Sequence, residues 1–339
     1  MNKKRKINIG LVGTGAWGWN LLRNYAEMPD FNLVACCDMK KSNLKKIHTS
    51  YPDVKTTSSF NDILKMEEID AISVATTASN HYRIAKAALL AGKDIYVEKP
   101  FTLTSDDAKE LRDLSRKKKK ILMVGHLLLY HPVVRELKRV IQSGEIGDIY
   151  YIYGQRLNLG KIRKDENALW SFAPHDVSVI LYLLDSVPVK VCATGSCYLQ
   201  KGVLDVVFMT LFFKDGKIAH IHMSWLDPHK IRRMTVVGSK KMAVFDDMQP
   251  TEKLRIYDKG AIRPGEILPY SDAITIREGD IHIPMVKMKE PLRLECEHFA
   301  ECVRERKKPL SDTQNGLDVV KILETAQKSL DNAGKPEKV

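Results

Sequence analysis

No stretch of this 339-residue chain approaches the roughly 20 consecutive apolar residues that a helix needs to cross a bilayer. Cysteine is scarce and scattered, with no Cys-x-x-Cys pair and no histidine cluster to complete a metal site. We therefore expect no membrane association, no bound metal, and cysteines that are reduced and structural. The six cysteines are Cys36, Cys37, Cys192, Cys197, Cys296 and Cys302.

A secretory leader is also missing from the sequence. The first six residues are basic, but residues 7–13 follow directly as an apolar strand and a glycine, without the apolar core and cleavage site of a signal peptide. No internal repeat is found either. The sequence therefore predicts a cytoplasmic location.

Acidic residues are in the minority, with 42 Asp and Glu against 54 Lys and Arg, for a formal net charge of +12. Much of the excess lies in residues 3–6 and 116–120, and both runs fit solvated faces. Aromatic residues make up only 7% of the chain and do not alternate with these runs, so we expect no nucleic-acid partner. The positive balance is consistent with an anionic small substrate such as a nucleotide sugar.

Apolar strands alternate with helical patterns over residues 7–124. Such alternation is typical of an α/β domain with a doubly wound parallel sheet of the Rossmann type. We therefore assign residues 1–124 to a nucleotide-binding domain. Its expected strands are 7–12, 32–37, 71–75, 94–97 and 121–124.

The pattern changes after Gly125. Consecutive strands are now joined by short turns, and Asp215-Gly216 between two of them is a strong hairpin signal. Residues 125–339 are therefore predicted to form an α+β domain with a mostly antiparallel open sheet. Within it we expect a helix over 174–184, an irregular region over 259–290 and two closing helices.

Residues 13–18 read Gly-Thr-Gly-Ala-Trp-Gly, a GxGxxG loop between the first strand and a helix. Gly13 permits the tight turn, Gly15 lets a pyrophosphate approach the backbone, and Gly18 lets the helix pack on the strand. Asp38 ends the second strand, about 20 residues downstream, where an acid binds ribose hydroxyls. The pattern predicts NAD rather than NADP, because a carboxylate repels the 2′-phosphate of NADP. The positive charges of the nearby Lys40 and Lys41 reduce this repulsion. Thr14, Ala16 and Trp17 complete the expected cofactor loop.

Two more loops follow strands of the same sheet. Thr76, Thr77 and His81 come after the third strand, and Glu98-Lys99-Pro100 closes the fourth. Ligands bind at the carboxyl ends of strands in open α/β sheets, so we expect Thr76, Thr77, His81 and Glu98 at the cofactor. Pro100 keeps Lys99 out of a helix. A first-turn helix residue at His81 and an ordinary strand end at Lys99 are the structural alternatives.

Together these motifs resemble the glucose-fructose oxidoreductase, inositol dehydrogenase and rhizopine-catabolism (Gfo/Idh/MocA) family. The resemblance rests on the glycine loop with Asp38, on residues 76–81, on residues 98–100 and on a histidine segment at residues 167–176. It covers nearly the whole chain. It implies a two-domain NAD-dependent oxidoreductase. Residues 170–176 are most similar to those of UDP-N-acetylglucosamine 3-dehydrogenases, which feed a pyridoxal-phosphate aminotransferase in surface-polysaccharide or lipid A synthesis.

The family carries an Asp-x-x-x-His pattern on a helix, and here His175 matches the histidine while Ser171 replaces the aspartate. The resemblance implies that His175 is the general base and Lys99 the polarising or relay group; the reverse assignment stays open. A substrate site is expected around Lys99, Ser171 and His175. Gln155, Arg156 and Asn158 are further candidates for sugar or diphosphate contacts, with a solvated strand edge as their alternative.

Two other functions stay open. One is an inositol or free-sugar dehydrogenase, and the other is a non-catalytic NAD-sensing regulator, since a fold alone does not decide function. We also expect a homodimer or homotetramer, because an apolar face of the second sheet needs covering. The residues expected on that face are Phe208, Leu211, Ile218, His220 and Met223.

Overall fold

The computed structural model describes residues 5–160, 166–262 and 275–339, and the chain divides into two compact units. The first unit takes in residues up to Tyr130 together with Lys289–Lys321; the second is His131–Met288 with Ile322–Val339. The first unit therefore extends beyond residue 124 to Tyr130 and includes a later segment of the chain. The ring of Phe299 in that segment packs edge-on against Tyr96, 5.9 Å away between ring centroids.

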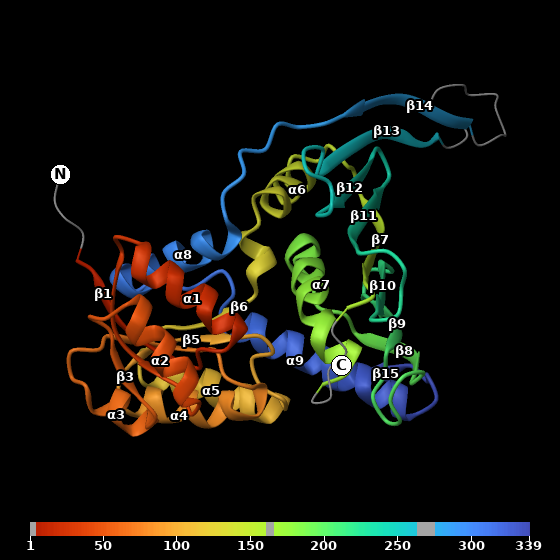
Figure 1. Cartoon of the computed structure of the whole chain (residues 1–339). Coiled ribbons are helices and arrows are strands. Elements are labelled where there is room, and N and C mark those ends of the chain that lie inside the picture. Colours follow the sequence, from red (N-terminus) through yellow and green to blue (C-terminus); the bar gives the residue numbers. More distant parts are fainter. Residues whose placement is uncertain (1–4, 161–165, 263–274) are drawn as a thin grey trace. The chain divides into compact units, whose positions relative to one another are not determined.

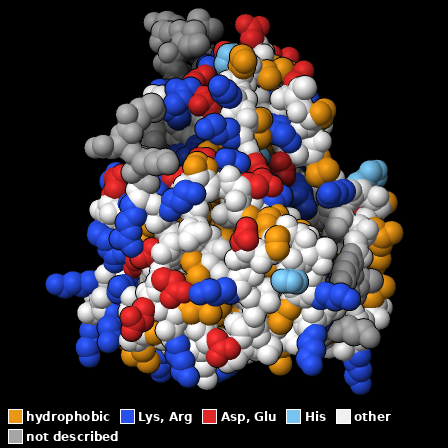
Figure 2. All heavy atoms as spheres, turned by 60° about the vertical axis from the view of Figure 1, so that its left-hand side comes forward, with side chains coloured by type: hydrophobic (Ala, Val, Ile, Leu, Met, Phe, Trp, Pro, Cys, Tyr) orange, Lys and Arg blue, Asp and Glu red, His pale blue; other side chains and the backbone are white. Residues whose placement is uncertain are grey.

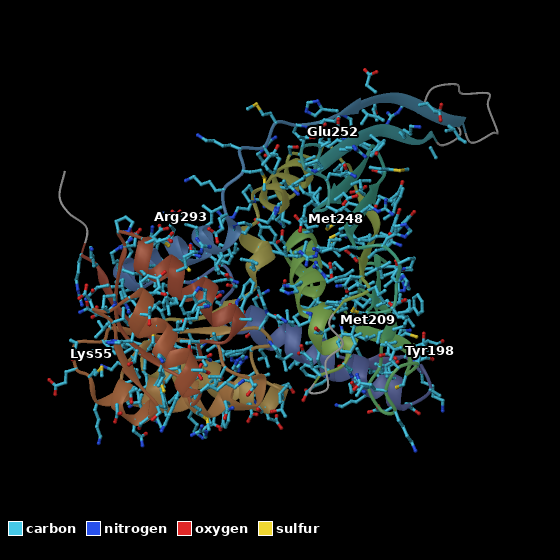
Figure 3. The ribbon with its side chains drawn as sticks, viewed as in Figure 1. Lys55, Tyr198, Met209, Met248, Glu252 and Arg293 are labelled. Atoms are coloured by element: carbon cyan, nitrogen blue, oxygen red, sulfur yellow. The ribbon has the colours of Figure 1, made fainter. Side chains whose placement is uncertain are left out.

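The first unit contains a six-stranded parallel sheet in the order β3-β2-β1-β4-β5-β6 (Figure 1). The sequence order reverses direction between β1 and β4, which creates the crevice where doubly wound folds bind ligands. This confirms the predicted fold class. β3 was not predicted, because its three residues, one of which is Lys55 (Figure 3), are polar. The strands are β1 (Ile7–Val12), β2 (Phe31–Cys37), β3 (Lys55–Thr57), β4 (Ala71–Val74), β5 (Asp94–Glu98) and β6 (Leu122–Gly125).

Helices surround this sheet. At the start of α5 the Thr104 hydroxyl accepts a hydrogen bond from Asp107 N at 3.1 Å and caps the helix N-terminus. Basic and acidic side chains are interspersed over the face shown in Figure 2. The elements are α1 (Ala16–Glu27), α2 (Lys41–Ser50), α3 (Phe60–Lys65), η1 (Ala78–Asn80), α4 (His81–Leu90), α5 (Ser105–Lys117), η2 (Leu127–Tyr130), α8 (Pro291–Glu305) and the first part of α9 (Thr313–Asp331).

The second unit contains a nine-stranded sheet in the order β14-β13-β12-β11-β7-β10-β9-β8-β15. Its described strand pairs are antiparallel except β7 with β10, as predicted for a mostly antiparallel sheet. Two strands run into the region expected to be irregular; their exposed, charged sequence hides the strand pattern. The strands are β7 (Ile149–Leu157), β8 (Lys190–Ser196), β9 (Val206–Phe212), β10 (Ile218–Ser224), β11 (Ile231–Gly238), β12 (Met242–Asp246), β13 (Leu254–Ile262), β14 (Thr275–His282) and β15 (Glu337–Lys338).

Helix α7 (Ala168–Leu184) packs against β7, β9 and β10, and α6 (Pro132–Gln142) packs beside it. The helix begins earlier than residue 174, because the Asn167 side chain accepts a hydrogen bond from Trp170 N and Pro174 lies inside the helix. None of the described helices has the length and apolar character that a bilayer span needs.

The residues expected on an open face of the second sheet lie on both faces. Leu211 and Met223 are fully buried, as is Met209 (Figure 3), whereas Phe208 and Ile218 are 41% and 42% exposed. Successive residues of a strand point to opposite faces, so the five side chains were never on one surface. Leu211 and Met223 therefore belong to the buried face of the sheet.

Candidate active site

The glycine loop after β1 is packed tightly at two positions and open at a third. Gly13 has a φ of +91°, and a Cβ atom there would lie 2.6 Å from the carbonyl of Ala75 at the end of β4. A Cβ atom on Gly18 would lie 2.0 Å from the carbonyl oxygen of Gly13. At Gly15 nothing lies within 4 Å of the Cβ position. The loop therefore leaves space where the backbone of α1 begins at Ala16, and this space fits a pyrophosphate.

Asp38 follows β2, and the loop itself organises its carboxylate. Oδ2 accepts hydrogen bonds from the amide and hydroxyl of Thr14, both at 2.8 Å, and from Asn43 at 3.0 Å. Oδ1 accepts one from the amide of Lys40 at 2.8 Å. Partial burial raises the pKa of Asp38, but these hydrogen bonds outweigh it and hold the pKa below its usual range. A half-buried, ionised carboxylate at this position suits ribose hydroxyls.

The loop after β4 holds Thr76, which is half-buried, and Thr77, which is exposed. His81, in contrast, is 1% exposed, and its ring lies between two backbone carbonyls. Nδ1 is 2.8 Å from the oxygen of Pro100 and Nε2 is 3.1 Å from the oxygen of Thr76. A neutral imidazole has one N–H, so one ring nitrogen donates to a carbonyl and holds the ring between the loops after β4 and β5. The cofactor contact expected of His81 stays a prediction.

Glu98 also uses its carboxyl group within the protein, and its expected contact with the cofactor stays a prediction. It is 6% exposed, and its carboxyl group is bonded within the first unit. Trp17 Nε1 donates to Oε1 at 2.5 Å, the Tyr96 hydroxyl lies 2.9 Å from the same oxygen, and the amide of Lys99 donates to Oε2 at 3.2 Å. Glu98 therefore supports the cofactor loop through Trp17, which is itself 41% exposed.

Lys99 follows β5 and is half-buried. Its charge acts on Glu98, on His81 and on His126, a buried residue directly after β6 that sequence reasoning missed. Burial lowers the pKa of His126 to about 4, and its Nδ1 lies 2.6 Å from Asn315 Oδ1. In the sheet Glu98 pairs with Gly125, and this pairing brings the end of β6 beside Lys99.

The second unit holds the remaining candidates. Ser171 and His175 lie one turn apart on the same side of α7, which is the geometry of the expected i, i+4 pair. Ser171 is 5% exposed and His175 is half-buried. The sequence alone predicted this segment only in part, because the helix was expected to begin at Pro174.

Arg156 is engaged in a way the sequence did not show. Its Nε and one terminal nitrogen donate to the two carboxylate oxygens of Asp176 at 2.6 and 3.1 Å, and both residues are buried. Arg156 is therefore buried in an ion pair and is not part of a solvated strand edge. A phosphate would have to compete with Asp176 for these nitrogens, and the expected contact of Arg156 with the substrate stays a prediction.

Gln155 and Asn158, close to Arg156 in the sequence, take no part in its ion pair with Asp176. Gln155 Oε1 accepts a hydrogen bond from Arg233 at 2.9 Å. Asn158 Oδ1 is buried and has no hydrogen-bond partner among the described residues. An amide oxygen in that state suits a ligand donor.

Two family models match the chain. One, described as an oxidoreductase family with an NAD-binding Rossmann fold, matches residues 7–126, and the GFO/IDH/MocA C-terminal domain matches residues 134–244. Together they cover most of the chain and confirm the resemblance drawn from its motifs.

Curated relatives include several dehydrogenases. An uncharacterized oxidoreductase, YrbE, of Bacillus subtilis is 25% identical and covers 96% of this chain and 95% of its own. UDP-N-acetylglucosamine 3-dehydrogenase of Acidithiobacillus ferrooxidans is 31% identical over 58% of this chain and 61% of its own. The NAD(+)-dependent scyllo-inositol 2-dehydrogenase of Bacillus subtilis is 25% identical over 91% and 89%.

Solved structures share the fold across nearly the whole chain. An oxidoreductase structure from Magnetospirillum magnetotacticum has a TM-score of 0.81 at 27% identity and covers 95% of this chain and 99% of its own. GenD2 from gentamicin A biosynthesis, solved with NAD, has a TM-score of 0.83 at 18% identity and covers 100% and 98%.

Proposed function

The chain belongs to the Gfo/Idh/MocA oxidoreductase family, whose Rossmann domain binds NAD, and on this basis we propose that it oxidises the 3-hydroxyl of UDP-N-acetylglucosamine to a ketone. The observation that carries the proposal is the position of Lys99, which follows β5 at the same sheet edge as Gly15 and Asp38. The relative from Acidithiobacillus ferrooxidans supports the choice of sugar.

Bound NAD supplies the hydride acceptor of this reaction. The protein has to remove the hydroxyl proton and stabilise the charge that develops on the sugar oxygen. A neutral histidine near pH 7 suits the first task, and we assign it to His175. A lysine ammonium suits the second, and we assign it to Lys99. Thr76 and Thr77 lie in the loop after the neighbouring strand β4 and are assigned to the cofactor.

The sugar nucleotide is assigned to the polar groups of the second unit. Ser171 and His175 share one side of α7, and Asn158 offers a buried amide oxygen without a described partner. Gln155 lies beside Arg156 on β7 and is placed to contact the sugar or diphosphate. Arg156 acts through Asp176, whose carboxylate it fixes on α7.

A second candidate is oxidation of an inositol. The Bacillus subtilis scyllo-inositol dehydrogenase matches a larger share of this chain than the UDP-sugar enzyme does, 91% against 58%. The similarity of residues 170–176 to UDP-N-acetylglucosamine 3-dehydrogenases favours the UDP-sugar. A non-catalytic regulator is disfavoured, because the chain keeps both Lys99 and His175.

We further place the reaction in the cytoplasm, upstream of a pyridoxal-phosphate aminotransferase that consumes the ketone for lipid A or surface-polysaccharide synthesis. A homodimer or homotetramer covers the exposed face of the second sheet. On that face Phe208 stacks on His222 at 4.3 Å between centroids, and Tyr151 stacks on Tyr153 at 6.3 Å.

The test is NADH formation, followed by absorbance, with UDP-N-acetylglucosamine and with myo-inositol. NADH with the nucleotide sugar alone supports the proposal. NADH with myo-inositol alone replaces it with the second candidate, and no NADH with either favours the regulator. Light scattering measures the assembly separately, and a monomer at working concentration contradicts the oligomer.

A further inference from the structure

Two glutamate side chains meet at one tyrosine hydroxyl inside the first unit. The Tyr96 hydroxyl lies 2.9 Å from Oε1 of Glu98 and 3.0 Å from Oε2 of Glu295, which belongs to α8. Tyr96 and Glu295 are fully buried. A hydroxyl carries one hydrogen, so it donates to only one of the two carboxyl groups. The other carboxyl group either donates to the hydroxyl oxygen or faces it as an uncompensated anion.

The two glutamates differ in their donors. Glu98 also accepts hydrogen bonds from Trp17 Nε1 and from the amide of Lys99. Among the described residues the Glu295 carboxyl group has only the Tyr96 hydroxyl as a hydrogen-bond partner, and its Oε1 is buried without one. Three donors suit an ionised carboxylate, whereas a buried anion with one shared contact is strongly penalised.

We propose that Glu295 is a positioning residue that carries a proton at neutral pH and donates a hydrogen bond to the hydroxyl oxygen of Tyr96. The tyrosine proton is thereby directed to Glu98, which stays ionised. The chain from Glu295 through Tyr96 to Glu98 holds a fixed negative charge directly before Lys99. Only the effect of this charge on turnover rests on the proposed function.

Packing leaves the three groups little freedom to separate. A Cβ atom on Gly125 would lie 2.7 Å from the Tyr96 hydroxyl and 3.0 Å from Oε2 of Glu98. The glycine at the end of β6 therefore makes room for this cluster. On its other side the ring of Tyr96 packs on Phe299 of α8, the helix that carries Glu295.

The charges around the cluster agree with this assignment. Burial and then the charge of Glu98 hold the pKa of Glu295 well above its usual range. Burial also raises the pKa of Glu98, and Trp17, Tyr96 and Lys99 oppose that rise. Among the described residues, the groups that shift the pKa of Glu295 are Glu98 and Tyr96, and neither is a cation. Glu295 itself acts on Tyr25, Cys296 and Tyr130, which burial keeps neutral. Lys99 acts on His81 and His126, whose pKa values burial lowers.

The direct test is the infrared carbonyl band of a protonated carboxylic acid, recorded on the full chain in D2O near neutral pD. Exposed carboxyl groups are ionised there, so they do not contribute. We expect the band in the wild type, its loss in Glu295→Gln and its retention in Glu98→Gln. A wild-type spectrum without the band overturns the proposal even if a variant fails to fold. Loss of the band in Glu98→Gln overturns it as well.

The effect on Lys99 is read from the pH profile of turnover. Glutamine at position 295 replaces the acid O–H by an amide N–H, so Glu295→Gln keeps the wild-type profile. Glu98→Gln removes the anion, so the limb of the profile that belongs to Lys99 moves to lower pH. An equal shift in Glu295→Gln contradicts the positioning role. Absence of turnover in the wild type contradicts the proposed function instead and leaves the infrared result to decide the protonation.

Discussion

Arg156 on β7 and Asp176 on α7 form a buried ion pair with two parallel hydrogen bonds, at 2.6 and 3.1 Å. The pair joins the helix that carries His175 to the sheet beneath it. Asp176 is adjacent to His175 in sequence, but its side chain is directed to β7. The pair therefore fixes the position of the helix.

Removing the acid should cost the second unit much of its stability. Asp176→Ala leaves the Arg156 guanidinium buried and unpaired, and breaking a buried pair in this way costs about 3–5 kcal/mol. Urea unfolding followed by circular dichroism measures the loss. Asp215→Ala, which removes an exposed partner of Lys217, is the control and should leave the midpoint close to that of the wild type. A midpoint in Asp176→Ala equal to that control contradicts the structural role.

Two glycines of the cofactor loop should respond differently to alanine. At Gly18 the new Cβ meets the Gly13 carbonyl at 2.0 Å, so Gly18→Ala should destabilise the first unit by about 1–3 kcal/mol. At Gly15 the position is open, so Gly15→Ala should unfold like the wild type and bind NAD more weakly. Urea unfolding and NAD titration by tryptophan fluorescence separate the two effects. Wild-type NAD affinity in Gly15→Ala would show that the open space is not the pyrophosphate site.

The cofactor loop and Lys99 were predictable because their signals are local. A glycine pattern, an acid at a set distance and a lysine before proline all lie on short stretches that join one strand to the next element. Glu295 was not predictable, because it reaches the Tyr96 hydroxyl from α8, 199 positions later in the chain. The burial of His81 and Glu98 could not be predicted from the sequence either. Both are polar residues near the carboxyl ends of the strands, but their polar atoms form hydrogen bonds within the protein.

Stability of the first unit should fall as the pH drops from about 6.5 to about 4, because burial lowers the pKa of His126 to about 4. In that window the unfolded chain binds a proton that the folded chain does not, so the contribution of neutral His126 is complete above the window and is lost through it. His126→Asn should show a shallower pH dependence in urea unfolding. His229→Asn, at an exposed position, is the control. Equal slopes in wild type and His126→Asn would contradict the buried, neutral histidine.

The last prediction concerns the two proposed catalytic residues, Lys99 and His175. Lys99→Ala removes the group that stabilises the developing oxyanion, and His175→Asn removes the base, so each should lower kcat by about 10²–10⁴-fold. Neither residue belongs to the glycine loop or contacts Asp38, so NAD affinity should change little. Lys109→Ala, on the exposed side of α5, controls for the loss of a positive charge. Wild-type kcat in either variant removes that residue from the mechanism. A loss of NAD affinity that matches the loss of kcat in Lys99→Ala would make the lysine a cofactor ligand, because a group that acts only on the sugar oxygen does not alter binding of the free dinucleotide.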